Sequence, residues 1–164
     1  MSIRAQLSEA LPSLSFSVLG GLLWAGLMAL SALVSMYLRH WENHAHFETI
    51  ILVFSLGGFF AFAPAMLAYN VIARGKTRSQ RFAAAYIALL FVTLGATAFV
   101  YYIQFRDYFA QWHEAALSRI WFLQTFYTGL GAAYEFAVLG SRFYLPIGLI
   151  ALFGASFWLS KKPV

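Results

Sequence analysis

Long stretches without a charged residue constrain this chain more than any other feature of its sequence. Three of them, residues 16–38, 49–73 and 82–105, exceed the about 20 residues that a helix needs to cross a bilayer. A soluble domain is about 25% charged, whereas this chain is 10% charged and 62% hydrophobic. We therefore expect an integral membrane protein, because only a bilayer favours so much apolar surface on the outside of a fold.

A fourth apolar stretch covers residues 143–160. Together the four stretches predict an all-α integral membrane protein in which residues 1–164 form a single membrane domain, a four-helix transmembrane bundle. The first stretch is longer than the apolar core of a signal peptide, so we interpret it as a retained span. Tyr101 and Tyr102 mark the end of the third span. The chain has no cysteine, which excludes disulfides, thiolate metal sites and thiol catalysis.

The region between the third and fourth stretches has a different pattern. Residues 105–118 place apolar side chains on one side of a helix and polar side chains on the other, which predicts an amphipathic helix lying on the membrane surface. Residues 120–140 are long enough to span a membrane but contain several polar residues. We interpret this second segment as either a re-entrant element or a fifth helix.

The positive charges predict the orientation. Residues 74–81 carry four cations and no anion, which favours the cytoplasmic side of a membrane. With four spans, 7 of the 11 Lys and Arg residues lie on that side, whereas a crossing by 120–140 reduces this number to 6. We therefore expect four spans, both termini in the cytoplasm and a location in a bacterial inner membrane. The net charge of +5 does not indicate nucleic-acid binding, because the cations lie at the ends of apolar segments.

Two of the predicted spans carry small residues at a spacing of four. Helices in lipid associate where small side chains let their backbones approach closely. Either these two faces pack on one another, or one of them binds another membrane subunit or a second copy of the chain. The residues are Ser17, Gly21, Ala25 and Ala29 in the first span and Gly57, Ala61 and Ala65 in the second.

A polar seam follows one face of the helix predicted near residues 120–140. It consists of Gln124, Thr128, Glu135 and Arg142. An ionisable residue at membrane depth is costly, so Glu135 indicates a functional site with a partner, and Arg142 is the nearest candidate in the sequence. The seam is either wet at the membrane interface, turned toward a polar cavity, or in contact with another subunit.

Three of the four histidines lie in RHWENHAHFE, residues 39–48. His40, His44 and Glu48 share a helical face, and His113 is expected at the same membrane level. Imidazole and carboxylate groups that converge on one point can hold a transition metal. A metal site at the outer face is therefore one interpretation, although the spacing matches no metalloenzyme motif, and a solvated loop is the other.

The layout of the chain is similar to that of a known family. Its size, the four expected spans, the cytoplasmic termini and a surface helix before the last span resemble the small membrane subunit of tripartite ATP-independent periplasmic transporters. YLPIGLIAL, residues 144–152, is similar to the last span of that family. The resemblance implies a membrane subunit of a transporter.

No catalytic grouping can be assembled from the sequence, since paired carboxylates, a Ser/His/Asp set and a glycine-rich phosphate loop are all missing. We therefore favour a non-catalytic small subunit or accessory factor of an inner-membrane complex, which acts through helix packing and the polar seam and needs no cofactor. The first alternative is an outer-face metal-binding protein or membrane enzyme. The second is a small homo-oligomeric channel or carrier built around residues 120–142.

Overall fold

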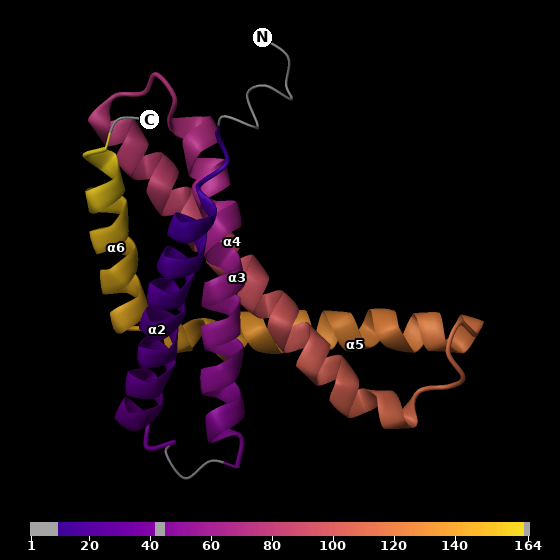
Figure 1. Cartoon of the computed structure of the whole chain (residues 1–164). Coiled ribbons are helices and arrows are strands. Elements are labelled where there is room, and N and C mark those ends of the chain that lie inside the picture. The colour runs from indigo at the N-terminus through magenta and orange to yellow at the C-terminus, as the bar shows by residue number, and fades with distance from the viewer. Residues whose placement is uncertain (1–9, 42–44, 163–164) are drawn as a thin grey trace.

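Helices make up the fold in the computed structural model, which describes residues 10–41 and 45–162. Helices α2 (Leu14–Leu38), α3 (Phe47–Ala73) and α6 (Ile147–Ser160) lie lengthwise beside one another, and the tilted helix α4 (Arg78–Phe109) crosses them (Figure 1). The later half of α4 diverges from α3 and extends past the bundle, where α5 (Arg119–Val138) turns back toward it. We call residues 101–139 the arm and the remaining helices the bundle.

Two of the long helices, and α5 in the arm, begin at a hydroxyl side chain that caps the first turn. Ser13 Oγ accepts a hydrogen bond from the Phe16 amide in α2, and Ser118 Oγ accepts one of 3.0 Å from Trp121 in α5. Thr77 forms a reciprocal capping box with Gln80 at the start of α4. Each cap satisfies an amide that lacks a partner within its helix, so these helices begin where a polar loop ends.

The separate surface helix predicted over residues 105–118 is wrong. Residues up to Phe109 belong to α4, a short 3-10 helix, η1, covers Ala110–Trp112, and residues 113–118 are not helical. The apolar side of the predicted helix continues an aromatic stripe of α4, in which the ring of Phe105 lies 5.7 Å from that of Tyr101 and 4.7 Å from that of Phe109. The amphipathic pattern therefore marks the end of a longer helix.

The segment expected to be a re-entrant element or a fifth helix, residues 120–140, is largely covered by α5 (Arg119–Val138), but residues 143–160 do not form a complete span. Helix α5 is followed by a 3-10 helix, η2 (Gly140–Tyr144), and by a bend of 73° into α6. Because α6 begins at Ile147 and has 14 residues, it is only about 21 Å long, less than the about 30 Å of a hydrocarbon core. Pro146 lies at the bend and precedes the first turn of α6.

The chain is an all-α membrane protein. Among residues 10–41 and 45–162, three helices, α2, α3 and α4 with η1, are long and apolar enough to cross a bilayer, and the number is four if the bent pair of α5–η2 and α6 counts as one span. Their outward surfaces carry large apolar side chains such as Leu23, Phe60 and Phe91, each more than half exposed. This surface is favourable in lipid and costly in water.

Two buried serines of α2 satisfy the backbone at the bend. Ser31 Oγ donates to the carbonyl of Phe143 and accepts from the amide of Gly148, both at 2.8 Å, while Ser35 Oγ donates to the carbonyl of Arg142. Ser31 lies about 10 Å before the end of α2, so the bend lies inside the bundle. Irregular backbone at membrane depth is tolerated only where such partners are present.

The two faces of small residues pack inside the chain. A Cβ at Gly21 would lie 3.2 Å from the Phe59 ring, so the stripe of α2 faces α3 as expected. A Cβ at Gly57 would lie 2.6 Å from Thr97 Cα, so the stripe of α3 faces α4 instead. The residues buried in these stripes are Gly21, Ala25, Gly57, Ala61 and Ala65, while Ser17 and Ala29 are half-buried.

Candidate functional site

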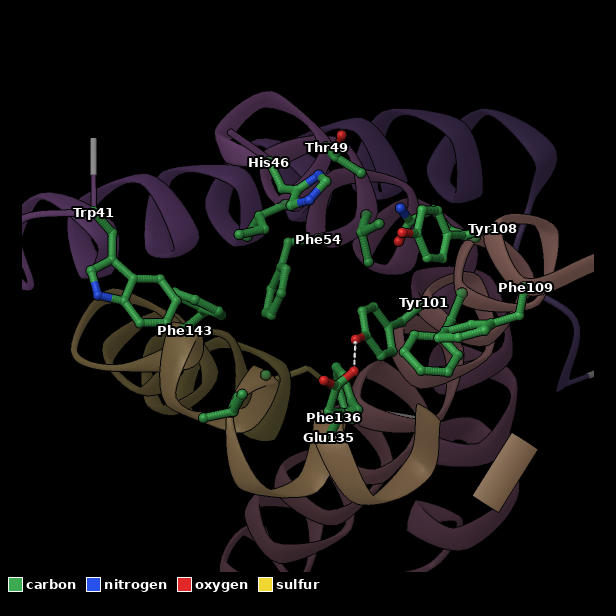
Figure 2. Close-up of a pocket in the computed structure, with 16 residues that line it drawn as sticks. Trp41, His46, Thr49, Phe54, Tyr101, Tyr108, Phe109, Glu135, Phe136 and Phe143 are labelled. Atoms are coloured by element: carbon green, nitrogen blue, oxygen red, sulfur yellow. Dashed lines mark hydrogen bonds between the residues drawn. The ribbon is translucent and has the colours of Figure 1, made fainter. Parts of the chain in front are cut away.

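A partly enclosed cavity of about 450 Å³ lies where the arm meets the bundle (Figure 2). Its walls come from the segment that follows α2, the first part of α3, the last turns of α4, the end of α5 and η2. The cavity therefore exists because α4 diverges from α3 and α5 returns toward the bundle, which brings together segments far apart in the sequence.

Aromatic rings form most of the cavity wall. The ring of Phe54 on α3 lies 5.6 Å from Phe143 and 6.4 Å from Phe136, and the Phe143 ring lies 5.8 Å from Trp41. Ring separations of this size are typical of favourable aromatic pairs. The rings hold one another in place around the cavity and leave a largely apolar interior.

Glu135 is the acidic residue among the described residues that line this cavity. It is half-buried on α5, and the hydroxyl of Tyr101 on α4 donates a hydrogen bond of 2.5 Å to its Oε2 (Figure 2). Its second oxygen, Oε1, has no hydrogen-bond partner within the described ranges, and no ion pair joins Glu135 to Arg142 there. The helix ends at Val138 and η2 changes the chain direction, so Arg142 leaves the face on which Glu135 lies.

The outer part of the predicted polar seam bonds within the arm. Gln124 Oε1 accepts a hydrogen bond of 2.9 Å from the backbone amide of Glu114, and Thr128 Oγ1 shares one of 3.2 Å with His113 Nε2. The seam therefore faces α4 and the loop that joins α4 to α5. Gln124 Oε1 and Thr128 Oγ1 therefore have partners within the chain.

The candidate metal ligands are not brought together. His40 and Glu48 are exposed near the start of α3, whereas His113 lies in the loop at the far end of the arm (Figure 1). His44 lies outside the described residues. Within the described ranges, no three His, Cys, Asp or Glu side chains are placed to hold a metal ion.

Sequence reasoning missed the pairing of Tyr101 with Glu135 and the role of Ser31 and Ser35. Tyr101 was interpretable only as a helix-end aromatic, because nothing in the sequence relates it to a residue 34 positions away. The serines do carry a signal: they lie four apart in an otherwise apolar span, where a polar side chain needs a partner on another helix.

Comparison of the chain with family models, with curated proteins and with solved structures gives no match. The resemblance to a transporter subunit therefore stays a prediction.

Proposed function

We propose that this chain is a non-catalytic membrane protein that binds a lipid-soluble molecule in the cavity beside Glu135 and acts as a small accessory subunit of a membrane complex. The observation that carries the proposal is the carboxylate of Glu135, held by Tyr101 at the wall of an aromatic cavity of about 450 Å³. Small-molecule sites are typically about 300–1,000 Å³, mostly apolar, with a few polar groups that orient the ligand.

The chemistry of the wall supports recognition of a ligand that has an apolar body and one polar group. Phe54, Phe136 and Phe143 offer flat apolar surfaces, while Glu135 and Gln104 offer hydrogen-bonding groups from α5 and α4. Because the cavity borders a bilayer, a molecule dissolved in the lipid has a direct route to it. Such a molecule is a candidate cargo or regulator of the complex.

The distribution of cations supports an orientation with both termini in the cytoplasm of a bacterial cell. Lys162 lies over the rings of Trp158 and Phe16, and Arg78 lies over Phe157, so the start of α4 and the segment after α6 bring cations to one end of the bundle. The positive-inside rule favours the cytoplasmic side for that end, and we propose this orientation. The cavity then lies toward the opposite, outer side.

A tryptophan placed in the cavity tests the proposal. Ile50 is half-buried and lines the cavity, whereas Leu52 on the same helix is 57% exposed. We expect protein purified from its own membranes to retain one class of lipid-soluble molecule, detected by native mass spectrometry. Ile50→Trp should lose it and Leu52→Trp should keep it. Equal content in the two variants contradicts the proposal.

A further inference from the structure

We infer that the ligand of this cavity is a lipophilic cation, an organic ammonium or a similar ion with an apolar body. The inference rests on the proposed function and adds the charge of the ligand. Three observations support it: the single carboxylate, the aromatic rings around it and the absence of Lys and Arg from the described residues that line the cavity.

No Lys or Arg among the described residues that line the cavity pairs with the carboxylate of Glu135, and His46 is the other ionisable side chain there besides the tyrosines. The hydrogen-bond partner of Glu135 is the hydroxyl of Tyr101, which donates to Oε2. A carboxylate away from bulk water is costly unless a positive charge pairs with it. A cation in the cavity would supply that charge.

The nearby guanidinium groups are directed elsewhere. Arg106 on α4 lies with its Cζ 6.0 Å from the ring of Trp121, and the side chain of Arg142 is exposed. Neither residue lines the cavity. A positive ligand would therefore meet no Lys or Arg at the described wall, where His46 is the one side chain that could carry a positive charge, whereas an anionic ligand would meet Glu135.

The aromatic wall suits the same kind of ligand. The faces of Trp, Tyr and Phe rings attract cations within about 6 Å of the ring centre, and quaternary ammonium groups are commonly recognised in this way. Trp41 reaches the cavity from the segment after α2, Tyr101 from α4 and Phe54 from α3, so rings approach it from several directions (Figure 2). They would also contact the apolar body of the ion.

Two ions of the same four-phenyl shape and opposite charge test the inference. We expect tetraphenylphosphonium to bind the purified full-length chain saturably, measured by calorimetry in detergent, and tetraphenylborate to bind about tenfold more weakly or less. Glu135→Gln should weaken phosphonium binding by about tenfold or more. Asp107→Asn, which removes an exposed acid on α4 outside the cavity, should leave it within about twofold.

Two further variants keep the result interpretable. Tyr101→Phe retains the ring and the charge, so it should preserve the preference for the phosphonium ion even if Glu135→Gln does not accumulate. Borate binding as tight as phosphonium binding, or a preference unchanged in Glu135→Gln, overturns the inference. If Ile50→Trp then weakens both ions equally, the cavity binds ligands without selecting cations; if it weakens neither, the proposed function fails as well.

Discussion

The bundle and the arm are built from the same kinds of apolar residue, yet they are held together differently. Large side chains such as Met28, Tyr69 and Leu89 are fully buried in the bundle. In α5 only Ala132 and Phe136 are buried among the described residues, while Phe126 and Tyr134 are more than 60% exposed. Hydrophobicity alone therefore does not determine which segments pack closely in lipid.

Polar groups show the same contrast. In the bundle they join helices: Tyr69 donates to the carbonyl of Leu159, and Trp24 Nε1 donates to Thr93 Oγ1 across buried contacts. In the arm, His113 with Thr128 and Gln124 with Glu114 form hydrogen bonds near the loop that joins α4 to α5. Glu135 differs, because its hydrogen bond with Tyr101 joins α5 to α4 at the cavity. The bundle thus holds the buried contacts between helices, and the junction with the arm holds the proposed ligand site.

The largest expected effect comes from the closest backbone approach in the bundle. In Gly57→Val the new side chain would overlap Thr97 and push α3 away from α4, at a cost of about 3 kcal/mol. Gly95→Val is the matched control, because a Cβ at Gly95 meets nothing within 4 Å. Thermal unfolding in detergent should show a strong loss of stability for the first variant and little change for the second. Equal melting temperatures would contradict the close approach.

A smaller effect is expected where a serine supports the bend. Ser31→Ala leaves the buried Gly148 amide and Phe143 carbonyl without their side-chain partner, which should cost about 1–2 kcal/mol. Ser156 is equally buried but bonds only to Leu152 in its own helix, so Ser156→Ala should cost less than about 0.5 kcal/mol. The free energy of unfolding of both variants can be measured by unfolding with dodecyl sulfate in mixed micelles. A larger loss in Ser156→Ala would argue against the bridging role of Ser31.

The smallest effect is expected at the tip of the arm. Thr128→Val removes the bond to His113 and should speed amide hydrogen exchange in residues 113–118, with at most about 0.5 kcal/mol lost from global stability. The same change at Thr125 is the control, because its buried hydroxyl has no partner within the described ranges. Thr125→Val should be neutral or slightly stabilising. Amide hydrogen exchange of residues 113–118 that rises equally in both variants would contradict the role of the hydrogen bond between Thr128 and His113.

The helices were predictable because their signal is local. Charge-free length identified the helices that became α2, α3 and α4 to within a few residues of their observed ends. The division of the last stretch was not predictable in the same way. Residues 143–146 carry no charge, so charge-free length does not mark the bend; Pro146 indicates a helix start there, but the sequence does not show that Ser31 and Ser35 supply partners for the bent backbone.

The site was predictable only in part. Glu135 was recognisable as an ionisable residue in an apolar segment, but its partner was not. On a continuous helix Arg142 would lie on the face of Glu135, whereas η2 ends that helix and Tyr101 approaches from α4. The cavity depends on where α4 diverges from α3, which is a property of packing between distant segments.

The central proposal is that Glu135 faces a cavity that lipid-soluble molecules reach more readily than solutes in the aqueous phase. Two carbodiimides test it in reconstituted vesicles: dicyclohexylcarbodiimide, which enters membranes, and a water-soluble analogue, with the modified acids identified by mass spectrometry. We predict that the lipophilic reagent modifies Glu135, less so in Ile50→Trp, and that the water-soluble reagent modifies exposed acids such as Asp107 and Glu114 instead. Modification of Glu135 by the water-soluble reagent as readily as Asp107 would contradict the account.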